Sequence, residues 1–207
     1  MNQNFKENTI NTFIYSSVLH EVYSYINKEA LRKVLRNTYK QLAPGGRIII
    51  RDVVGPEKGK EKVLLELNEE DGKNSGDIKS LSTYAKFYRF VKDFIPRKIK
   101  FKEKKIDGKK LIEMTLSDAY EFMSKMNYID NWQSEMHEEF GFWNFSDWKK
   151  ELKEIGFEIV AGSHPFKSEY IIEKMYTGKV IIYKQKGKDL AIVNYPSTNI
   201  ILAGEKT

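Results

Sequence analysis

The sequence contains no cysteine and only three histidines among its 207 residues. The absence of cysteine excludes disulfide scaffolds, thiolate zinc sites and a cysteine nucleophile. His20, His137 and His164 are too scattered to suggest a histidine metal cluster, so we expect no metal site. No apolar run is long enough to span a bilayer, and residues 1–11 lack the apolar core of a signal peptide. These absences favour a soluble cytoplasmic protein.

The composition is sufficient for a folded core, because 41% of the residues are hydrophobic and 13% are aromatic. The net charge of +6 is unevenly distributed: residues 97–110 hold eight basic and two acidic side chains and account for the whole excess. A solvated, lysine-rich hairpin is the favoured interpretation of this segment, and an arm that contacts nucleic-acid phosphates is the alternative.

The first 54 residues have the pattern of a strand, a helix and a second strand. Residues 12–19 form a β-branched and aromatic run without alternating polarity, which is typical of a strand buried on both faces. Asn27 is a suitable N-cap for a helix over residues 28–42, and residues 43–46, with the sequence APGG, end that helix. Residues 47–54 then predict a second buried strand. This order predicts a βαβ unit with two parallel strands side by side.

The remaining sequence predicts an insertion followed by further elements of the sheet. We expect residues 1–55 and 145–207 to form one α/β domain, and residues 56–144 to form a helical and hairpin insertion. Within the insertion we predict a loop with a helical turn or two over 55–76, and a hairpin that turns at Asp107-Gly108. Further helices are expected around 82–94, 117–128 and 145–156, and further strands of the main sheet at 157–161, 179–183 and 199–203.

Three stretches together carry a family resemblance. They are FIYSSVLHE at residues 13–21, LAPGGRIII at 42–50, and the Trp148-x3-Leu152-x3-Gly156-Phe157-x-Ile159 pattern. In this order they resemble the C-terminal portion of a class I, Rossmann-like S-adenosylmethionine-dependent methyltransferase. The resemblance implies an α/β fold with a partial sheet equivalent to strands 4-5-7-6. It also implies methyl transfer from S-adenosyl-L-methionine to a small-molecule acceptor, with the insertion as the acceptor lid.

The sequence departs from that family in its cofactor-binding half. Only eleven residues precede the first predicted strand, no Gly-x-Gly occurs in the 207 residues, and no acidic residue is placed to hold the cofactor ribose. The first strand would then form an uncovered edge of the sheet. We therefore expect an upstream or partner chain to supply the missing half, and weak or absent cofactor binding by this chain alone. The alternative is a non-catalytic, degenerate methyltransferase module that binds a protein or RNA partner.

The resemblance assigns cofactor contacts to the end of the first strand. It implies that Ser16 and Ser17 lie against the methionine part of the cofactor, and that Leu19 and His20 lie beside the adenine or the methyl group. The competing interpretation of the serines is a pair of strand-end hydroxyls that cap the next segment. His20 is either a general base or a packed, hydrogen-bonded core histidine.

Two further candidates follow the second strand. In open α/β sheets, ligands bind at the carboxyl ends of the strands, and Arg51 and Asp52 occupy that position. A carboxylate at Asp52 faces the crevice and can orient an acceptor amine or hydroxyl, so we assign it both catalytic and substrate-binding roles. Arg51 is assigned to substrate binding.

Residues 131–148, NWQSEMHEEFGFWNFSDW, have the most unusual local composition. His137 and Glu138 are candidate catalytic groups that polarise the acceptor, while Glu139 and Trp143 are candidate substrate contacts. The competing interpretation is that the aromatic side chains form a small core for the insertion. A metal site is disfavoured, because adjacent residues on a helix point apart.

Overall fold

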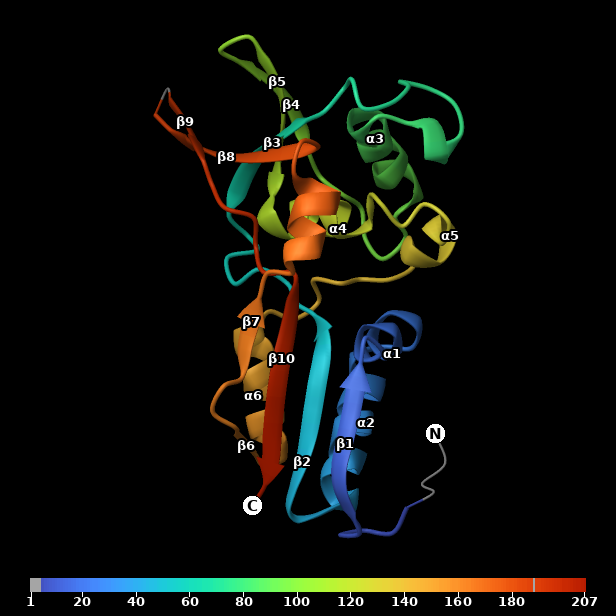
Figure 1. The fold of residues 1–207 in the computed structure, drawn as a ribbon, viewed down its shortest axis with the longest axis vertical. Coiled ribbons are helices and arrows are strands. Elements are labelled where there is room, and N and C mark those ends of the chain that lie inside the picture. The colour runs from blue at the N-terminus through green and yellow to red at the C-terminus, as the bar shows by residue number, and fades with distance from the viewer. Residues whose placement is uncertain (1–4, 188) are drawn as a thin grey trace. The chain divides into compact units, whose positions relative to one another are not determined.

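The computed structural model describes residues 5–187 and 189–207, which fold into two compact units (Figure 1). The first unit contains residues 5–57, 139–166 and 197–207, and the second contains residues 58–138 and 167–196. Both units are mixed α/β, each with its own sheet. The segment 167–196 lies in the second unit, whereas the sequence analysis placed it in the first. The two units are described separately below.

The first unit is built on a mixed sheet. It contains β1 (Ile10–Ser16), β2 (Leu42–Val53), β10 (Asn199–Lys206) and β6 (Phe157–Ile159) in this order, and β7 (His164–Phe166) also pairs with β10. β1 and β2 are parallel neighbours, with Ser16 opposite Arg51. This confirms the predicted parallel pairing. β10 runs antiparallel to β2, β6 and β7.

Three helices belong to the first unit: α1 (Leu19–Tyr25), α2 (Lys28–Gln41) and α6 (Phe145–Ile155). The predicted cap of α2 is confirmed, because Asn27 Oδ1 accepts a hydrogen bond from the Ala30 N–H at 2.9 Å. α6 begins with a capping box at Asn144 and ends at Gly156, where φ is +117°. The apolar stripes of α2 and α6 pack on the sheet in one core, whose largest fully buried members are Trp148, Leu19, Leu31, Leu35, Leu42 and Ile48.

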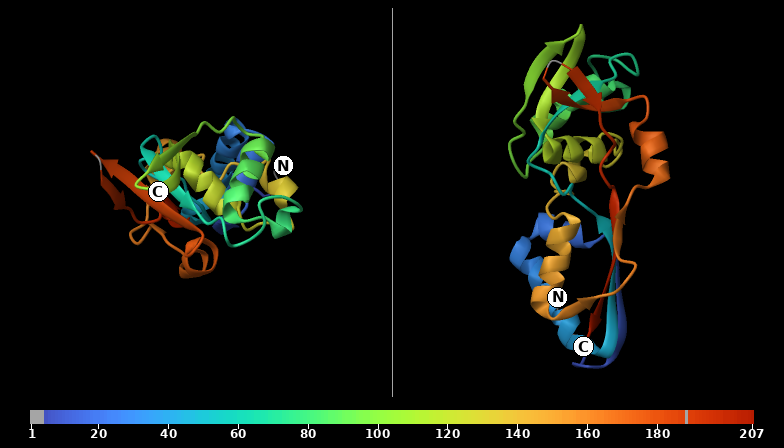
Figure 2. Two further views of the ribbon diagram at one scale, coloured as in Figure 1. Left: turned by 90° about the horizontal axis from the view of Figure 1, so that it is seen from above. Right: turned by 90° about the vertical axis from the view of Figure 1, so that its left-hand side faces the viewer.

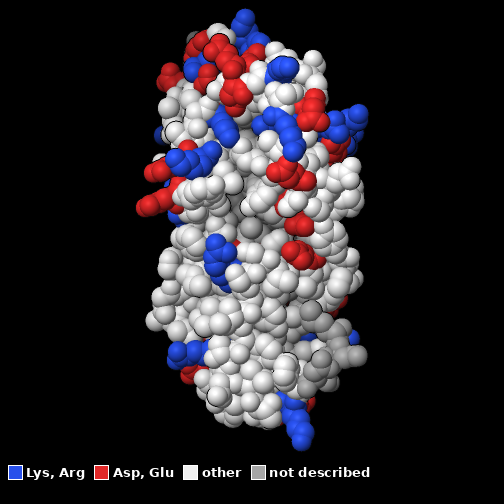
Figure 3. All heavy atoms as spheres, turned by 45° about the vertical axis from the view of Figure 1, so that its right-hand side comes forward, with Lys and Arg blue, Asp and Glu red and all other residues white. Residues whose placement is uncertain are grey.

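The other face of this sheet is open within the first unit. Figure 2 shows α2 and α6 on the same side of β2 and β10. A row of apolar residues, Ile14, Ile49 and Ala203, crosses three strands on the opposite face, and Ile14 is 70% exposed. Figure 3 shows few charged side chains over the part of the surface formed by β1, β2 and β10. The prediction that the first strand is buried on both faces is therefore wrong, and the expectation of an uncovered edge is confirmed, because β1 pairs only with β2 within the described sheet.

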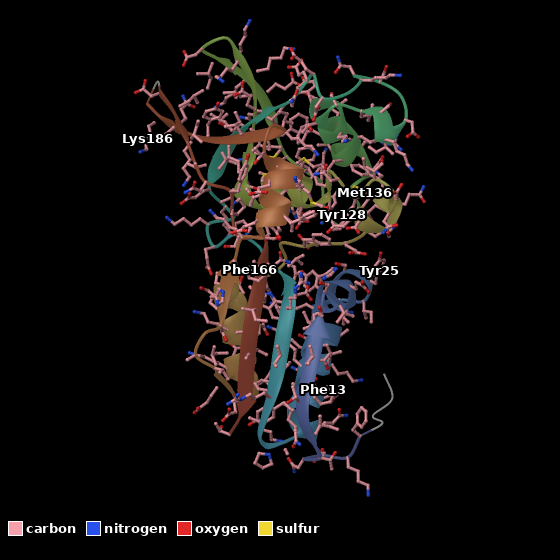
Figure 4. All side chains as sticks on the ribbon, viewed as in Figure 1. Phe13, Tyr25, Tyr128, Met136, Phe166 and Lys186 are labelled. Atoms are coloured by element: carbon pink, nitrogen blue, oxygen red, sulfur yellow. The ribbon has the colours of Figure 1, made fainter. Side chains whose placement is uncertain are left out.

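The second unit is built on an antiparallel sheet with the order β4-β5-β3-β8-β9. Its strands are β3 (Lys62–Leu67), β4 (Lys102–Ile106), β5 (Lys109–Thr115), β8 (Val180–Lys186) and β9 (Asp189–Ile192). The predicted hairpin turn is confirmed, with φ of 50° at Asp107 and 78° at Gly108. Figure 4 labels Lys186 at the end of β8 and Phe13 on β1 of the first unit.

Two sequence predictions for this region are wrong. Residues 62–67 form β3, the central strand, where a loop with a helical turn was expected. Its residues Val63, Leu64 and Leu65 are all buried, so the strand shows no alternation. The strand at 180–186 pairs with β3 instead of joining the first sheet.

Helices pack on the second sheet and form its core. They are α3 (Thr83–Asp93), capped by Ser82, α4 (Leu116–Lys125), capped by Thr115, and α5 (Trp132–Glu135). A 3-10 turn (Ile78–Ser80) and a π-helical turn (Ile171–Tyr176) complete the unit. No helix in the described part of the chain is both long and apolar enough to cross a membrane. The core includes the buried side chains Phe87, Phe90, Phe122, Met114, Ile182 and Tyr176.

Candidate active site

The carboxyl ends of β1 and β2 place Asp52 beside the start of α1. The two strands are parallel, so their carboxyl ends lie at the same edge of the sheet. After Ser16 the chain turns through Ser17, which has a left-handed φ of 51°, and α1 begins at Leu19. This sharp turn brings the first turn of α1 back over the end of β2. His20 and Asp52 meet there.

Asp52 and His20 form a buried hydrogen-bonded pair. His20 Nδ1 lies 2.5 Å from Asp52 Oδ1, and the residues are 6% and 0% exposed. Asp52 also accepts hydrogen bonds from the Leu19 N–H to Oδ2 at 2.9 Å and from the Val53 N–H to Oδ1 at 2.8 Å. Two backbone N–H donors and the imidazole nitrogen thus surround this carboxyl group, so both of its oxygen atoms are hydrogen-bonded although it is buried.

The pair orients the imidazole. When Nδ1–H donates to Asp52, Nε2 is the ring nitrogen that can accept a proton, and the carboxylate stabilises the imidazolium that results. The Phe140 ring packs edge-on against the imidazole, with ring centroids 5.0 Å apart. His20 is therefore packed and hydrogen-bonded, as the competing interpretation expected.

The other predicted residues at the strand ends form an exposed polar group. Ser16, Ser17 and Arg51 are all exposed. Arg51 donates a hydrogen bond from Nη1 to Ser17 Oγ at 3.1 Å, and the Ser17 N–H donates to the Arg51 carbonyl oxygen at 2.7 Å. Leu19 differs from the serines, because its side chain is fully buried in the core and its N–H is bonded to Asp52.

The residues of the 131–148 segment separate into different environments. In the second unit, His137 is exposed, and its Nδ1 lies 2.7 Å from the Gln133 carbonyl oxygen one turn earlier, while Glu138 is buried. In the first unit, the Glu139 N–H donates to Ser24 Oγ at 2.8 Å. Trp143 is 4% exposed and packs edge-on against Trp148. Trp143, a predicted substrate contact, is thus a buried core residue of the first unit.

His20 and Asp52 were separate candidates in the sequence, and Phe140 was not a predicted site residue. Their spacing along the chain gives no sign of contact. A usable signal was available, however: two polar residues follow two strands that were predicted to be adjacent and parallel, and such residues meet at one edge. Phe140 carries no comparable signal, because it lies 120 positions from His20 in an aromatic-rich segment whose folding the sequence does not reveal.

The strand-end residues fit one wall of a cofactor site and not a complete one. Ser16 and Ser17 present exposed hydroxyl groups there, but the chain has no Gly-x-Gly to approach a nucleotide closely. Among residues 5–187 and 189–207, no three His, Asp or Glu side chains are grouped so that they could hold a metal ion. No protein-family model matches the chain, and no curated protein matches it either.

Proposed function

We propose that this chain supplies the acceptor side of an S-adenosylmethionine-dependent methyl transfer to a small molecule. The observation that carries the proposal is the buried His20–Asp52 pair at the carboxyl ends of two adjacent parallel strands. The strand order β1-β2-β10-β6 supports it, because the resemblance implies the order 4-5-7-6. In the proposal, His20 is the base and Asp52 is the residue that positions it.

The chemistry assigned to these residues is the removal of a proton. A sulfonium donor is already activated by its charge, so methyl transfer chiefly requires a positioned acceptor and, where the acceptor carries a proton, a base. His20 Nε2 takes that proton while Nδ1–H stays bonded to Asp52. The new imidazolium is then stabilised by a carboxylate 2.5 Å away in a buried setting. Arg51, at the exposed end of the second strand, is proposed to bind the acceptor.

The cofactor is proposed to be held by a half that contains the glycine-rich loop. This half is carried either by an upstream part of the same polypeptide or by another chain. The outer edge of β1 suits it, because an edge strand presents unpaired backbone groups to an added strand. The apolar row formed by Ile14, Ile49 and Ala203 adjoins that edge and would be covered at the same time.

Measurements of cofactor binding test whether a second half is needed to hold S-adenosyl-L-methionine. Calorimetric titration of the 207-residue chain with S-adenosyl-L-methionine is expected to show weak binding or none. Co-expression with an upstream-encoded polypeptide that carries an acidic-x-Gly-x-Gly loop is expected to restore binding. Micromolar binding by the chain alone contradicts the proposed need for a second half.

Substitution of His20 tests the proposed base. In the complemented protein, His20→Gln is expected to lower transfer of the labelled methyl group by about 100-fold or more. His164→Gln is the matched control, because His164 is an exposed histidine of the same unit, and its Nδ1 lies 2.6 Å from the nearby Gly162 carbonyl oxygen. Equal rates for His20→Gln and the wild type would remove His20 from the mechanism.

The second candidate function is a non-catalytic module that binds a protein. The open edge and apolar face of the first sheet favour it. RNA is less favoured as the partner, because the basic hairpin is partly neutralised: Lys104, Lys109 and Lys110 pair with Glu113, Glu66 and Glu69. RNA binding that disappears with salt and on charge reversal of Lys102, Lys104 and Lys105 would support the RNA module. Salt-insensitive behaviour would exclude it.

A further inference from the structure

A hollow on the second unit lies outside the candidate active site. It has a volume of about 560 Å³, within the range of small-molecule sites. One wall is a face of α3, since Tyr84, Ala85, Tyr88 and Lys92 recur at spacings of one helical turn. The rest of the lining comes from the loop at residues 74–76 and from Glu69, Leu81 and Lys110.

The hollow has a cationic end. Lys92 forms no ion pair among the described residues, and it lies three positions from Arg89 on the same helix. Arg89 donates to Asp93 through Nε, which leaves the other N–H groups of its guanidinium as donors. Lys110 is paired with Glu69 at 2.8 Å, and Arg89 is paired with Asp93. Within the described part of the chain, Lys92 therefore supplies the unpaired positive charge that can attract an anion, and Arg89 adds guanidinium N–H donors one turn away.

The middle of the hollow suits a flat ring. Ala85 is the smallest side chain of the wall, and it lies beside Leu81 and the Tyr84 and Tyr88 rings. Tyr88 donates its hydroxyl proton to Glu103 at 2.7 Å, so the 2.9 Å contact between the two hydroxyls is a donation from Tyr84 to Tyr88. The rings are thereby held in place and offer apolar contact to a ligand, and the Lys110 ammonium lies over the Tyr84 ring at 5.8 Å from its centroid.

We propose that this hollow binds a small organic anion that carries an aromatic ring. Its anionic group lies at Arg89 and Lys92, and its ring lies over Ala85 against the pair formed by Tyr84 and Tyr88, whose own rings pack edge to face with centroids 5.1 Å apart. The residues that contact the ligand's ring and its anionic group, at positions 85, 89 and 92, all lie on one helix, α3. The inference is independent of the proposed methyl transfer, because it uses only side chains of the second unit.

Phenyl phosphate is the probe ligand. Inorganic phosphate and phenol are the comparison ligands, because each carries only one of the probe's two parts, the anionic group or the ring. Calorimetric titration of the full chain is expected to show saturable binding of phenyl phosphate, tighter than that of either comparison ligand. Equal affinity for phenyl phosphate and inorganic phosphate would overturn the ring contact, and with it the proposal. Absence of saturable binding would overturn it as well.

Variants locate the site. Lys92→Met is expected to weaken phenyl phosphate binding about tenfold, since it removes one charge-assisted contact. Ala85→Leu is expected to weaken phenyl phosphate binding similarly by filling the middle of the hollow, and leucine keeps the helix intact. Lys105→Met, at an exposed lysine of the hairpin outside the hollow, is the control and is expected to bind like the wild type. The proposal fails if Lys92→Met and Ala85→Leu bind like the wild type, or if Lys105→Met weakens binding as much as they do.

Discussion

The imidazole of His20 and the carboxyl group of Asp52 are in contact at 2.5 Å, although 32 positions separate the two residues in sequence. The contact follows from topology. A parallel strand pair brings both strand ends to one edge, and the left-handed turn at Ser17 directs α1 over that edge. Because Asp52 also bonds the Leu19 N–H, the carboxyl group ties α1 to β2. The pair therefore has a structural role that can be measured without any substrate.

We predict that Asp52→Asn destabilises the first unit by about 1.5–3 kcal/mol, the range for a hydrogen bond to a charged group. The amide keeps one acceptor oxygen but places an NH2 group beside a backbone N–H that donates to Asp52 in the wild type. Urea unfolding followed by tryptophan fluorescence measures the effect, because Trp143 and Trp148 lie in the core of this unit. Glu21→Gln, at an exposed acid of α1, is the control and should change stability by less than about 0.5 kcal/mol. Equal stability of the two variants would contradict the role of Asp52.

Local sequence signals predicted the elements whose causes are themselves local. Asn27 caps α2 through its own side chain, the Asp107-Gly108 turn needs positive φ at both residues, and Gly156 ends α6 in a left-handed conformation. The parallel pairing of β1 and β2 was also predictable, because a strand, a helix and a strand in close succession leave few alternatives. Of these features, the parallel pair of β1 and β2 carries the residues of the candidate site.

Features that depend on distant partners were not predictable. The segment at residues 62–67 is flanked by charged residues, and only its place between β5 and β8 makes it a buried strand. The strand at 180–186 has the same composition whichever sheet it joins. In the site, the partner of Asp52 followed from topology, whereas the Phe140 ring against His20 arrives from a loop 120 positions away. Packing across such separations leaves no trace in spacing or periodicity.

A pH-dependent prediction concerns Glu151, which joins α6 to α2. Burial by itself raises the pKa of the Glu151 carboxyl group, but hydrogen bonds and charge from Arg32, with Lys28 adding to them, outweigh burial and lower that pKa below its ordinary value. Arg32 contacts both carboxylate oxygens, at 2.7 and 2.6 Å. An acid with a lowered pKa in the folded state stabilises the fold above its unfolded pKa, and that contribution is lost as the pH falls through the folded value.

Glu151→Gln should therefore lower the thermal unfolding midpoint at pH 7. The difference from the wild type should shrink below about pH 4.5, as the wild-type carboxylate becomes protonated. Thermal unfolding followed by circular dichroism between pH 3 and pH 7 measures both effects. Glu154→Gln is the matched control on the same helix, because Glu154 is exposed and its contact with Lys150 is 3.8 Å long. A constant difference between Glu151→Gln and the wild type at every pH would contradict the ionic role.

Gly156 is expected to tolerate no side chain. Its φ of +117° disfavours any L-residue, and a Cβ there would lie 2.9 Å from the Tyr39 hydroxyl oxygen and 3.0 Å from its ring carbon Cζ. Gly156→Ala should cost about 1–3 kcal/mol in the free energy of unfolding. Gly162→Ala separates the two causes, because Gly162 also has a positive φ, of +88°, but nothing lies within 4 Å of its Cβ position. Chemical denaturation should rank Gly156→Ala as the more destabilising; the reverse order would contradict the steric argument.

Ile14 tests whether the open face of the first sheet is an assembly surface. Because its side chain is 70% exposed, Ile14→Lys should change the stability of this chain by less than about 0.5 kcal/mol. The same lysine would place an unpaired charge under the proposed complementing half, so co-purification of the two halves should be lost. Ile26→Lys is the control, because Ile26 is similarly exposed at 65% but follows α1 instead of lying on the sheet. If Ile14→Lys and Ile26→Lys co-purify with the complementing half equally well, the edge and face of β1 are not where that half binds, and the function proposed for the His20–Asp52 pair must be completed elsewhere.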